Sequence, residues 1–139
     1  MDLTGQWEAT IIYGKEYRED KGKELCFQMD LVQYGDEIAG TAIDTGGIGV
    51  SPDPATILGK VINNDIEFIK RYDSSHYLDR GGKVVVDRSR RGHKIKYSAS
   101  FNETNQIFTG VWTIRIWVLF LWFIPIVWSC NGTWTMKRK

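Results

Sequence analysis

The sequence has few of the residues that build metal sites and many active sites. Its 139 residues include two histidines, two cysteines and three prolines. Neither His76 nor His93 has a partner at a spacing typical of metal ligands, and no His-Glu-x-x-His or Cys-x-x-Cys motif is present. A nucleophile elbow and a phosphate-binding glycine loop are also missing. We therefore expect no metal, no cofactor and no enzymatic activity.

The sequence also lacks an excess of charge of either sign. Eighteen Lys and Arg residues balance seventeen Asp and Glu residues, which gives a formal net charge of +1. Such a balance produces no global field that would attract nucleic acid. The densest cationic segment comprises Arg88, Arg90, Arg91, His93, Lys94 and Lys96. We interpret this segment as a solvated turn and expect no nucleic-acid partner.

The N-terminal segment has no feature of an export signal. Met1 leads directly into an alternating stretch, with neither a basic segment nor an apolar core of signal-peptide type. We therefore expect a cytoplasmic protein, which would reach a membrane from the cytoplasmic side. In that compartment Cys26 and Cys130 are expected to be reduced and buried rather than joined by a disulfide.

Strand-forming residues are abundant, with six Trp, six Tyr and six Phe beside many Val, Ile and Thr. Apolar and polar residues alternate with the period of two that is typical of half-buried strands. This pattern predicts strands at 3–13, 24–31, 37–45, 55–62, 66–72, 83–87, 94–101, 107–114 and 129–136. We expect a solvated loop at 15–24, another loop at 73–82, and a hairpin that pairs 83–87 with 94–101. The fold class predicted is all-β.

A glycine recurs between two apolar residues of one strand face. The pattern is found at Leu3-x-Gly5-x-Trp7, Ile38-x-Gly40-x-Ala42, Ile57-x-Gly59-x-Val61, Phe108-x-Gly110-x-Trp112 and Cys130-x-Gly132-x-Trp134. Glycine within a strand marks a bend, a bulge or a close neighbour. Five such positions in a meander favour a sheet that curls and closes. We predict one domain, residues 1–139, that forms a single antiparallel up-and-down barrel of about eight strands.

The opening segment Leu3-Thr-Gly-Gln-Trp7 resembles the first strand of the calycin barrels, which include lipocalins, avidins and fatty-acid-binding proteins. The resemblance implies that Trp7 lies at the closed end, beneath a basic residue of the last strand, either Lys137 or Arg138. Residues 13–25 are too short and charged for the helices of fatty-acid-binding proteins. The lipocalin Thr-Asp-Tyr motif and the avidin contacts to biotin are missing. The resemblance implies a lipocalin-like, ligand-binding barrel.

Large side chains at inward positions are the candidate ligand-binding residues: Trp7, Phe27, Met29, Phe68, Tyr97, Phe101, Trp112 and Trp134. They would either line a pocket for a lipid or a flat aromatic molecule, or fill a solid core. We predict a non-enzymatic protein that binds a small hydrophobic ligand. Two alternatives stay open. One is a solid structural barrel that acts through oligomerisation, and the other is an enzyme with an acid–base site at the barrel mouth, built on His76, Asp73 and Asp79.

Residues 116–128 form a run of thirteen without a polar side chain, between the units Gly110-Val-Trp112 and Gly132-Thr-Trp134. As a helix this run would span about 20 Å, too short for a bilayer core of about 30 Å. Pro125 also disfavours a helix. We predict an apolar hairpin extension at about 115–129, with Trp112 opposite Trp134 and a turn centred on Phe123.

Both faces of such an extension are apolar, so something must cover it. The barrel mouth, a second copy of the chain and a lipid bilayer all remain candidates. The side chains expected to make this contact are Trp117, Leu119, Phe120, Trp122, Phe123 and Trp128. Tryptophan suits the membrane boundary, and Arg115 and residues 137–139 supply cations nearby. The expected partners are therefore a small apolar molecule, a membrane surface or a second copy of the chain.

Overall fold

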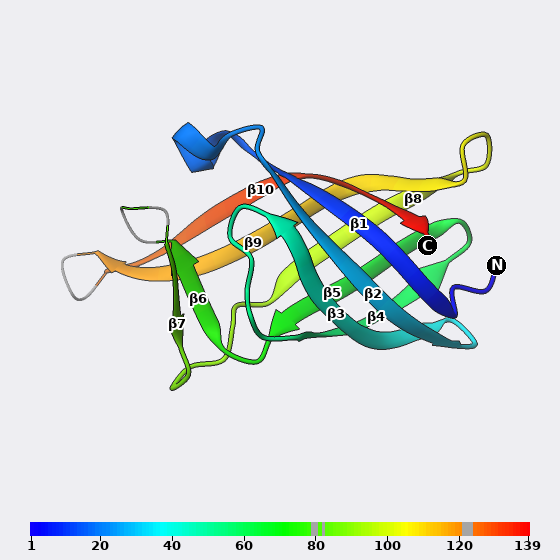
Figure 1. The fold of residues 1–139 in the computed structure, drawn as a ribbon, viewed down its shortest axis with the longest axis horizontal. Helices are drawn as coiled ribbons and strands as arrows, with labels where there is room; N and C mark the ends of the chain where they lie inside the picture. Colours follow the sequence, from blue (N-terminus) through cyan, green and yellow to red (C-terminus); the bar gives the residue numbers. More distant parts are fainter. Residues whose placement is uncertain (79–80, 82, 121–123) are drawn as a thin grey trace.

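Eight antiparallel strands close into a barrel in the computed structural model, which describes residues 1–78, 81, 83–120 and 124–139 (Figure 1). Around the barrel the strands run β1, β10, β9, β8, β5, β4, β3 and β2. Their bounds are β1 Gly5–Tyr13, β2 Glu24–Tyr34, β3 Glu37–Gly47, β4 Ala55–Ile62, β5 Asp65–Tyr72, β8 Ile95–Asn102, β9 Ile107–Phe120 and β10 Ile124–Arg138. The predicted all-β, meandering barrel is confirmed.

Three expectations about the connections were wrong. The stretch expected to be a loop at 73–82 contains β6 (Ser75–Leu78), which pairs with β7 (Val84–Asp87) in a separate two-stranded ribbon. The segment 83–87 therefore does not pair with 94–101. Strand β8 pairs with β5 and β9 instead, and this pairing buries Tyr97 and Ala99 inside the barrel. Residues 15–20 form a short 3-10 helix, η1 (Lys15–Asp20), rather than an irregular loop.

The two Gly-x-Trp units of β9 and β10 face each other reciprocally. Trp112 lies opposite Gly132, and Trp134 lies opposite Gly110. The predicted pairing of Trp112 with Trp134 was therefore wrong by two residues. A Cβ atom on Gly132 would overlap the carbonyl oxygen of Ile12 and lie 2.6 Å from Trp112 Nε1. Glycine thus leaves the space that the opposite indole fills. The turn expected at Phe123 lies outside the described residues.

The barrel half that holds the chain termini is tightly packed. Trp7, Phe27, Met29, Phe68 and Trp134 are each at most 3% exposed. The ring of Trp134 lies edge-on to Phe68, with centroids 5.4 Å apart, and its Nε1 donates to the carbonyl of Ser98 at 3.0 Å. The large inward side chains in this half are therefore core residues, held in place by one another.

The end of this packed half is covered by a cation over an indole. The Arg138 guanidinium lies 4.6 Å from the ring centroid of Trp7, and Trp7 Nε1 donates to the carbonyl of Leu3 at 2.8 Å. Arg138 also donates to the carbonyls of Thr4 and Asp2, at 3.0 and 2.8 Å. The expectation that a basic residue of the last strand packs over Trp7 is confirmed, and both termini lie at this end (Figure 1).

Strands β9 and β10 continue beyond the barrel. Strand β8 pairs with β9 as far as Ile114, and β1 pairs with β10 as far as Gly132. Beyond those residues, within the described part of the chain, β9 and β10 pair with each other alone, out to Phe120 opposite Ile124. Trp117, Leu119, Phe120 and Trp128 lie on this two-stranded extension. Trp122 and Phe123 lie outside the described residues.

Candidate functional site

A cavity of about 490 Å³ occupies the half of the barrel away from the termini. Its apolar wall is formed by residues of the four barrel strands β1, β2, β8 and β9: Ile11, Leu25, Ile95, Trp112 and Ile114. Ligand pockets in proteins usually measure about 300–1,000 Å³. The interior therefore combines a solid half with a hollow half large enough for one small molecule.

Connecting segments surround the mouth of this cavity. Helix η1 contributes Tyr17, the loop after β3 contributes Ile48 and Gly49, and the β6–β7 ribbon contributes His76. Tyr13 contacts both η1 and the loop after β3. Its hydroxyl donates to the carbonyl of Ile48 at 2.9 Å, and its ring centroid lies 4.6 Å from that of Tyr17. Burial, aided by the charges of Asp44 and Asp20, raises the pKa of Tyr13 to about 12.

A lysine points into the cavity from β5. Lys70 is 1% exposed, and its Nζ lies 3.7 Å from the ring centroid of Phe27, 5.0 Å from that of Tyr72 and 5.3 Å from that of Tyr97. No described residue accepts a hydrogen bond from this Nζ. Burial lowers the pKa of Lys70 to about 8, although the charge of Asp44 acts in the opposite direction. The three rings partly compensate for the lost hydration of the ammonium.

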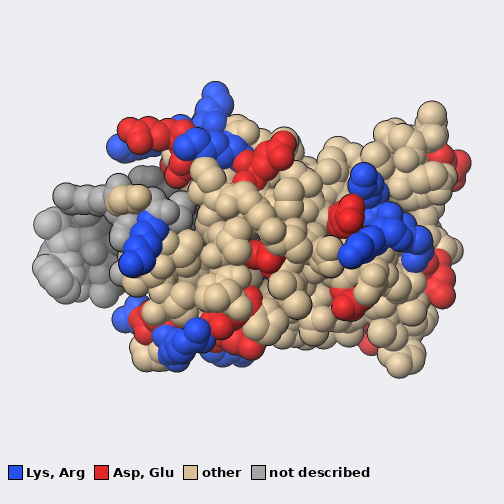
Figure 2. Space-filling model, in the orientation of Figure 1, with Lys and Arg blue, Asp and Glu red and all other residues tan. Residues whose placement is uncertain are grey.

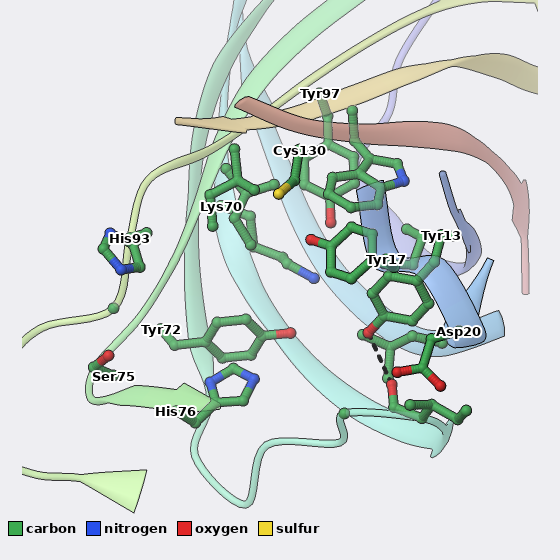
Figure 3. A pocket seen from close by; sticks show the side chains of 18 residues that line it. Tyr13, Tyr17, Asp20, Lys70, Tyr72, Ser75, His76, His93, Tyr97 and Cys130 are labelled. Atoms are coloured by element: carbon green, nitrogen blue, oxygen red, sulfur yellow. Dashed lines mark hydrogen bonds between the residues drawn. The ribbon is translucent and has the colours of Figure 1, made fainter. Parts of the chain in front are cut away.

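The hydroxyl of Tyr97 also lacks a hydrogen-bond partner among the described residues. The side chain is fully buried, and its ring stacks on Phe68 with centroids 4.9 Å apart and lies edge-on to Trp134. Burial raises the pKa of Tyr97 well above its usual value, so its hydroxyl keeps its proton. Figure 3 shows this hydroxyl and the Lys70 amine directed into the same space. The cavity thus presents two unused donors beside each other.

Both carboxylate oxygens of Asp44 have hydrogen-bond partners, unlike the Lys70 amine and the Tyr97 hydroxyl. Asp44 lies on β3 and is 8% exposed. One oxygen accepts from the Tyr72 hydroxyl at 2.7 Å, and the other accepts from the Ser51 backbone N–H at 2.8 Å. Burial, followed by the charge of Asp44, raises the pKa of Tyr72 above its usual range. Asp44 is therefore stabilised without a direct ion pair to Lys70.

His76 lies at the mouth, with its ring edge-on to Tyr72 and the two centroids 4.7 Å apart. Burial lowers the pKa of His76, which favours the neutral imidazole. Of the aspartates proposed as its partners, Asp73 is exposed and Asp79 lies outside the described residues. The hypothesis of an acid–base site at the barrel mouth therefore stays a prediction.

The eight candidate ligand-binding residues divide between the two halves of the barrel. Tyr97 and Trp112 line the cavity. Phe27 borders it through its contact with Lys70. Phe101 is partly buried and packs on Phe108, with centroids 4.9 Å apart. The remaining four, Trp7, Met29, Phe68 and Trp134, belong to the packed core.

Sequence reasoning missed Lys70 and Asp44, although a signal was present. Lys70 follows Ile66 and Phe68 at alternate positions of one strand, and all three prove to be buried. Asp44 likewise follows Ala42 on the inward face of its strand. A charged residue at an inward position of an alternating strand is the pattern that identifies both. Charged residues are rarely buried in protein cores, so this pattern is informative.

The cationic segment 88–96 is partly neutralised at the surface. Arg88 binds both carboxylate oxygens of Asp53 at 2.9 Å, and Arg90 lies 3.8 Å from Asp87. On the face shown in Figure 2, Lys and Arg side chains alternate with Asp and Glu rather than form a continuous patch. This mixture suits a solvated surface.

Within the described part of the chain, no three His, Cys, Asp or Glu side chains gather closely enough to hold a metal ion. Cys26 and Cys130 are not joined by a disulfide, and Cys130 lines the cavity. Among the helices that the structure describes, none is long and apolar enough to cross a bilayer. The cavity thus presents apolar walls, one amine, several hydroxyls, the Cys130 thiol, the imidazoles of His76 and His93 and the carboxylate of Asp20.

Comparisons with known proteins assign no family. No protein-family model matches the chain, and neither the curated proteins nor the solved structures include a match to it. The function is therefore argued from the site itself.

Proposed function

We propose that the chain is a calycin-like, non-enzymatic barrel that binds one small, largely apolar molecule in its cavity. The observation that carries this proposal is the apolar space of about 490 Å³ in the half of the barrel away from the termini. A solid structural barrel would have filled that space with side chains, as the other half does.

The size of the cavity sets the size of the ligand. At about 30 Å³ for each water-sized group, the space holds roughly 16 groups at most. A chain of about ten carbons fits with room for a polar end. Burying about ten methylene groups yields about 8 kcal/mol before the costs of association. The proposal therefore implies an affinity in the micromolar range or weaker.

The test is competition between a small uncharged fluorescent probe, 1-aminonaphthalene, and decanol. We expect wild type to bind the probe saturably and decanol to displace it. Ile114 lines the cavity, so Ile114→Trp should fill it and abolish probe binding while the barrel still unfolds cooperatively. Ile43→Trp is the matched control, because Ile43 is 59% exposed on the outer face. Failure of wild type to bind either molecule would refute the proposal.

We further propose that the β9–β10 extension mediates contact with a membrane or with a second copy of the chain. The supporting observation is that residues 115–120 and 124–129 of β9 and β10 pair beyond the last barrel contacts, over an apolar sequence. Because apolar burial outweighs the contribution of nearby cations, flotation with liposomes should persist in high salt and be lost in Trp117→Ser/Phe120→Ser. Wild type that never floats and sediments as a monomer would exclude both partners.

A further inference from the structure

We propose that the ligand carries a carboxylate, which the amine of Lys70 and the hydroxyl of Tyr97 hold at the inner end of the cavity. The inference rests on the proposed function and names the chemical class of the ligand. The two groups are the buried donors that face the cavity and lack an acceptor among the described residues. Both lie at the boundary with the packed core, so an acidic group bound there would be the leading end of the ligand.

This site requires hydrogen-bond acceptors for its two donors and a negative charge near its ammonium, and a carboxylate supplies both. Its oxygens accept hydrogen bonds from the ammonium and from the hydroxyl, and its charge compensates for the positive charge of Lys70. An alcohol or an ester would accept hydrogen bonds but leave the buried charge uncompensated. The aromatic faces of Phe27 and Tyr97 attract the ammonium without occupying its hydrogen-bonding positions. Lys70 is therefore already placed in the cavity, with its donors available.

One negative charge fits this cavity better than two. Lys70 is the one Lys or Arg among the described residues that line it. The carboxylate of Asp44 is already negative nearby, and its oxygens are engaged by Tyr72 and Ser51. A phosphate monoester, with a charge of about −1.5 to −2 near neutral pH, would leave negative charge uncompensated beside Asp44. The observations thus favour a monocarboxylate over a phosphate.

The apolar body of the ligand then has a defined direction. The wall beyond Lys70 is formed by Leu25, Ile11 and Ile114 and by the Trp112 ring. This wall leads toward the mouth, where Tyr13 and Tyr17 lie. A medium-chain fatty acid bound with its carboxylate inward would place its chain along this wall.

Other titratable groups face Lys70 from the surrounding elements. They are Tyr13 of β1, Tyr17 and Asp20 of η1, Asp44 of β3, Tyr72 of β5, His76 of β6, His93 just before β8, Tyr97 of β8 and Cys130 of β10. The pKa values of the four tyrosines lie above their usual range, and that of His76 lies below its own. Lys70, with a pKa of about 8, loses its positive charge just above neutral pH. The part of an affinity loss in that window that Lys70→Met abolishes reports on its ammonium.

The test compares decanoate with decanol, which share one chain length, by displacement of 1-aminonaphthalene. At about pH 7 we expect wild type to prefer decanoate by about tenfold or more, the value of one charge-assisted pair. Lys70→Met should lose this preference and keep its binding of decanol. Tyr97→Phe should reduce the preference several-fold. Lys96→Met is the matched control, because Lys96 precedes Tyr97 on β8 but is exposed, and it should behave as wild type.

The pH dependence supplies the second arm. Above about pH 8 the preference of wild type for decanoate should fall toward that of Lys70→Met, by up to about tenfold per pH unit, while the affinity for decanol stays constant. Equal binding of decanoate and decanol by wild type, or a preference that survives in Lys70→Met, would overturn this inference alone. Binding of neither molecule would overturn the proposed function as well.

Discussion

The amine of Lys70 lies 3.7 Å from the centre of the Phe27 ring, where the packed half of the barrel meets the cavity. Phe27 belongs to the core, and Lys70 lines the hollow half. The contact supports a buried ammonium that no described side chain hydrogen-bonds. A protein that kept this arrangement for stability alone would gain more from an apolar residue, because a buried charge without hydrogen bonds costs free energy.

The first prediction concerns the pH dependence of stability. Burial lowers the pKa of Lys70 from 10.5 in the unfolded chain to about 8, so between these values the unfolded state binds more protons. Stability therefore rises with pH through this window, by about 2 kcal/mol between about pH 7 and pH 9.5. Urea unfolding of wild type and Lys70→Met at both pH values measures it. The tyrosines are common to both proteins, so their difference isolates Lys70. Identical pH profiles would contradict the assignment.

The second prediction concerns two buried tyrosines that differ in hydrogen bonding. Tyr72→Phe removes the donor to Asp44 and leaves a buried carboxylate oxygen without its partner. We expect a loss of about 1–3 kcal/mol in the free energy of unfolding. Tyr97→Phe removes a hydroxyl that has no described partner, and should be neutral or stabilising without ligand. Equal losses in the two variants, measured by urea unfolding, would contradict this difference between the hydroxyls.

The third prediction concerns the reciprocal Gly-x-Trp units. Gly132→Ala would place a methyl group against the Ile12 carbonyl and the Trp112 indole, and should cost about 3 kcal/mol or more. Gly46→Ala is the control, because nothing lies within 4 Å of a Cβ atom there and its φ is not positive. A midpoint shift in thermal unfolding measures both. A Gly132→Ala protein as stable as Gly46→Ala would show that the strands do not approach so closely.

The fourth prediction concerns the closed end. Arg138→Ala removes the cation from above Trp7 and two hydrogen bonds to the carbonyls of Thr4 and Asp2. We expect a loss of about 1–3 kcal/mol. Lys137→Ala, one residue earlier on the same strand and exposed, should change stability by less than about 0.5 kcal/mol. A thermal-unfolding comparison in which Lys137→Ala matched Arg138→Ala would point to a general charge effect instead.

Much of the barrel could be predicted because its determinants are local. Alternation at 3–13 and 55–62 reports which face is buried, and strands β1 and β4 follow it closely. The β6–β7 ribbon could not be predicted in this way, because residues 75–78 show no such alternation and pair only where the chain brings them to β7. The register of Trp112 depends on Gly132 of another strand, which no local pattern contains.

The candidate site could be predicted only in part. Tyr97 and Trp112 were found as large inward residues, but the same criterion selected Trp134 and Phe68, which fill the core. Side-chain size does not say where a barrel is hollow, since that depends on how side chains from all eight strands meet. Lys70 was missed because the candidates were chosen among large apolar side chains, and Lys70 is the one charged residue on the inward face of β5.

Calorimetric titration of wild type with decanoate, at about pH 7 and two temperatures, measures directly whether the cavity binds a ligand. We expect saturation at one molecule per chain, with a negative heat-capacity change from burial of the apolar chain. Ile114→Trp, with the cavity filled, should give no binding heat, while Ile43→Trp should titrate as wild type does. Absence of saturable binding of decanoate to wild type would contradict the assignment of the cavity as a site for a carboxylate, and equal binding to Ile114→Trp would contradict its assignment as a ligand site.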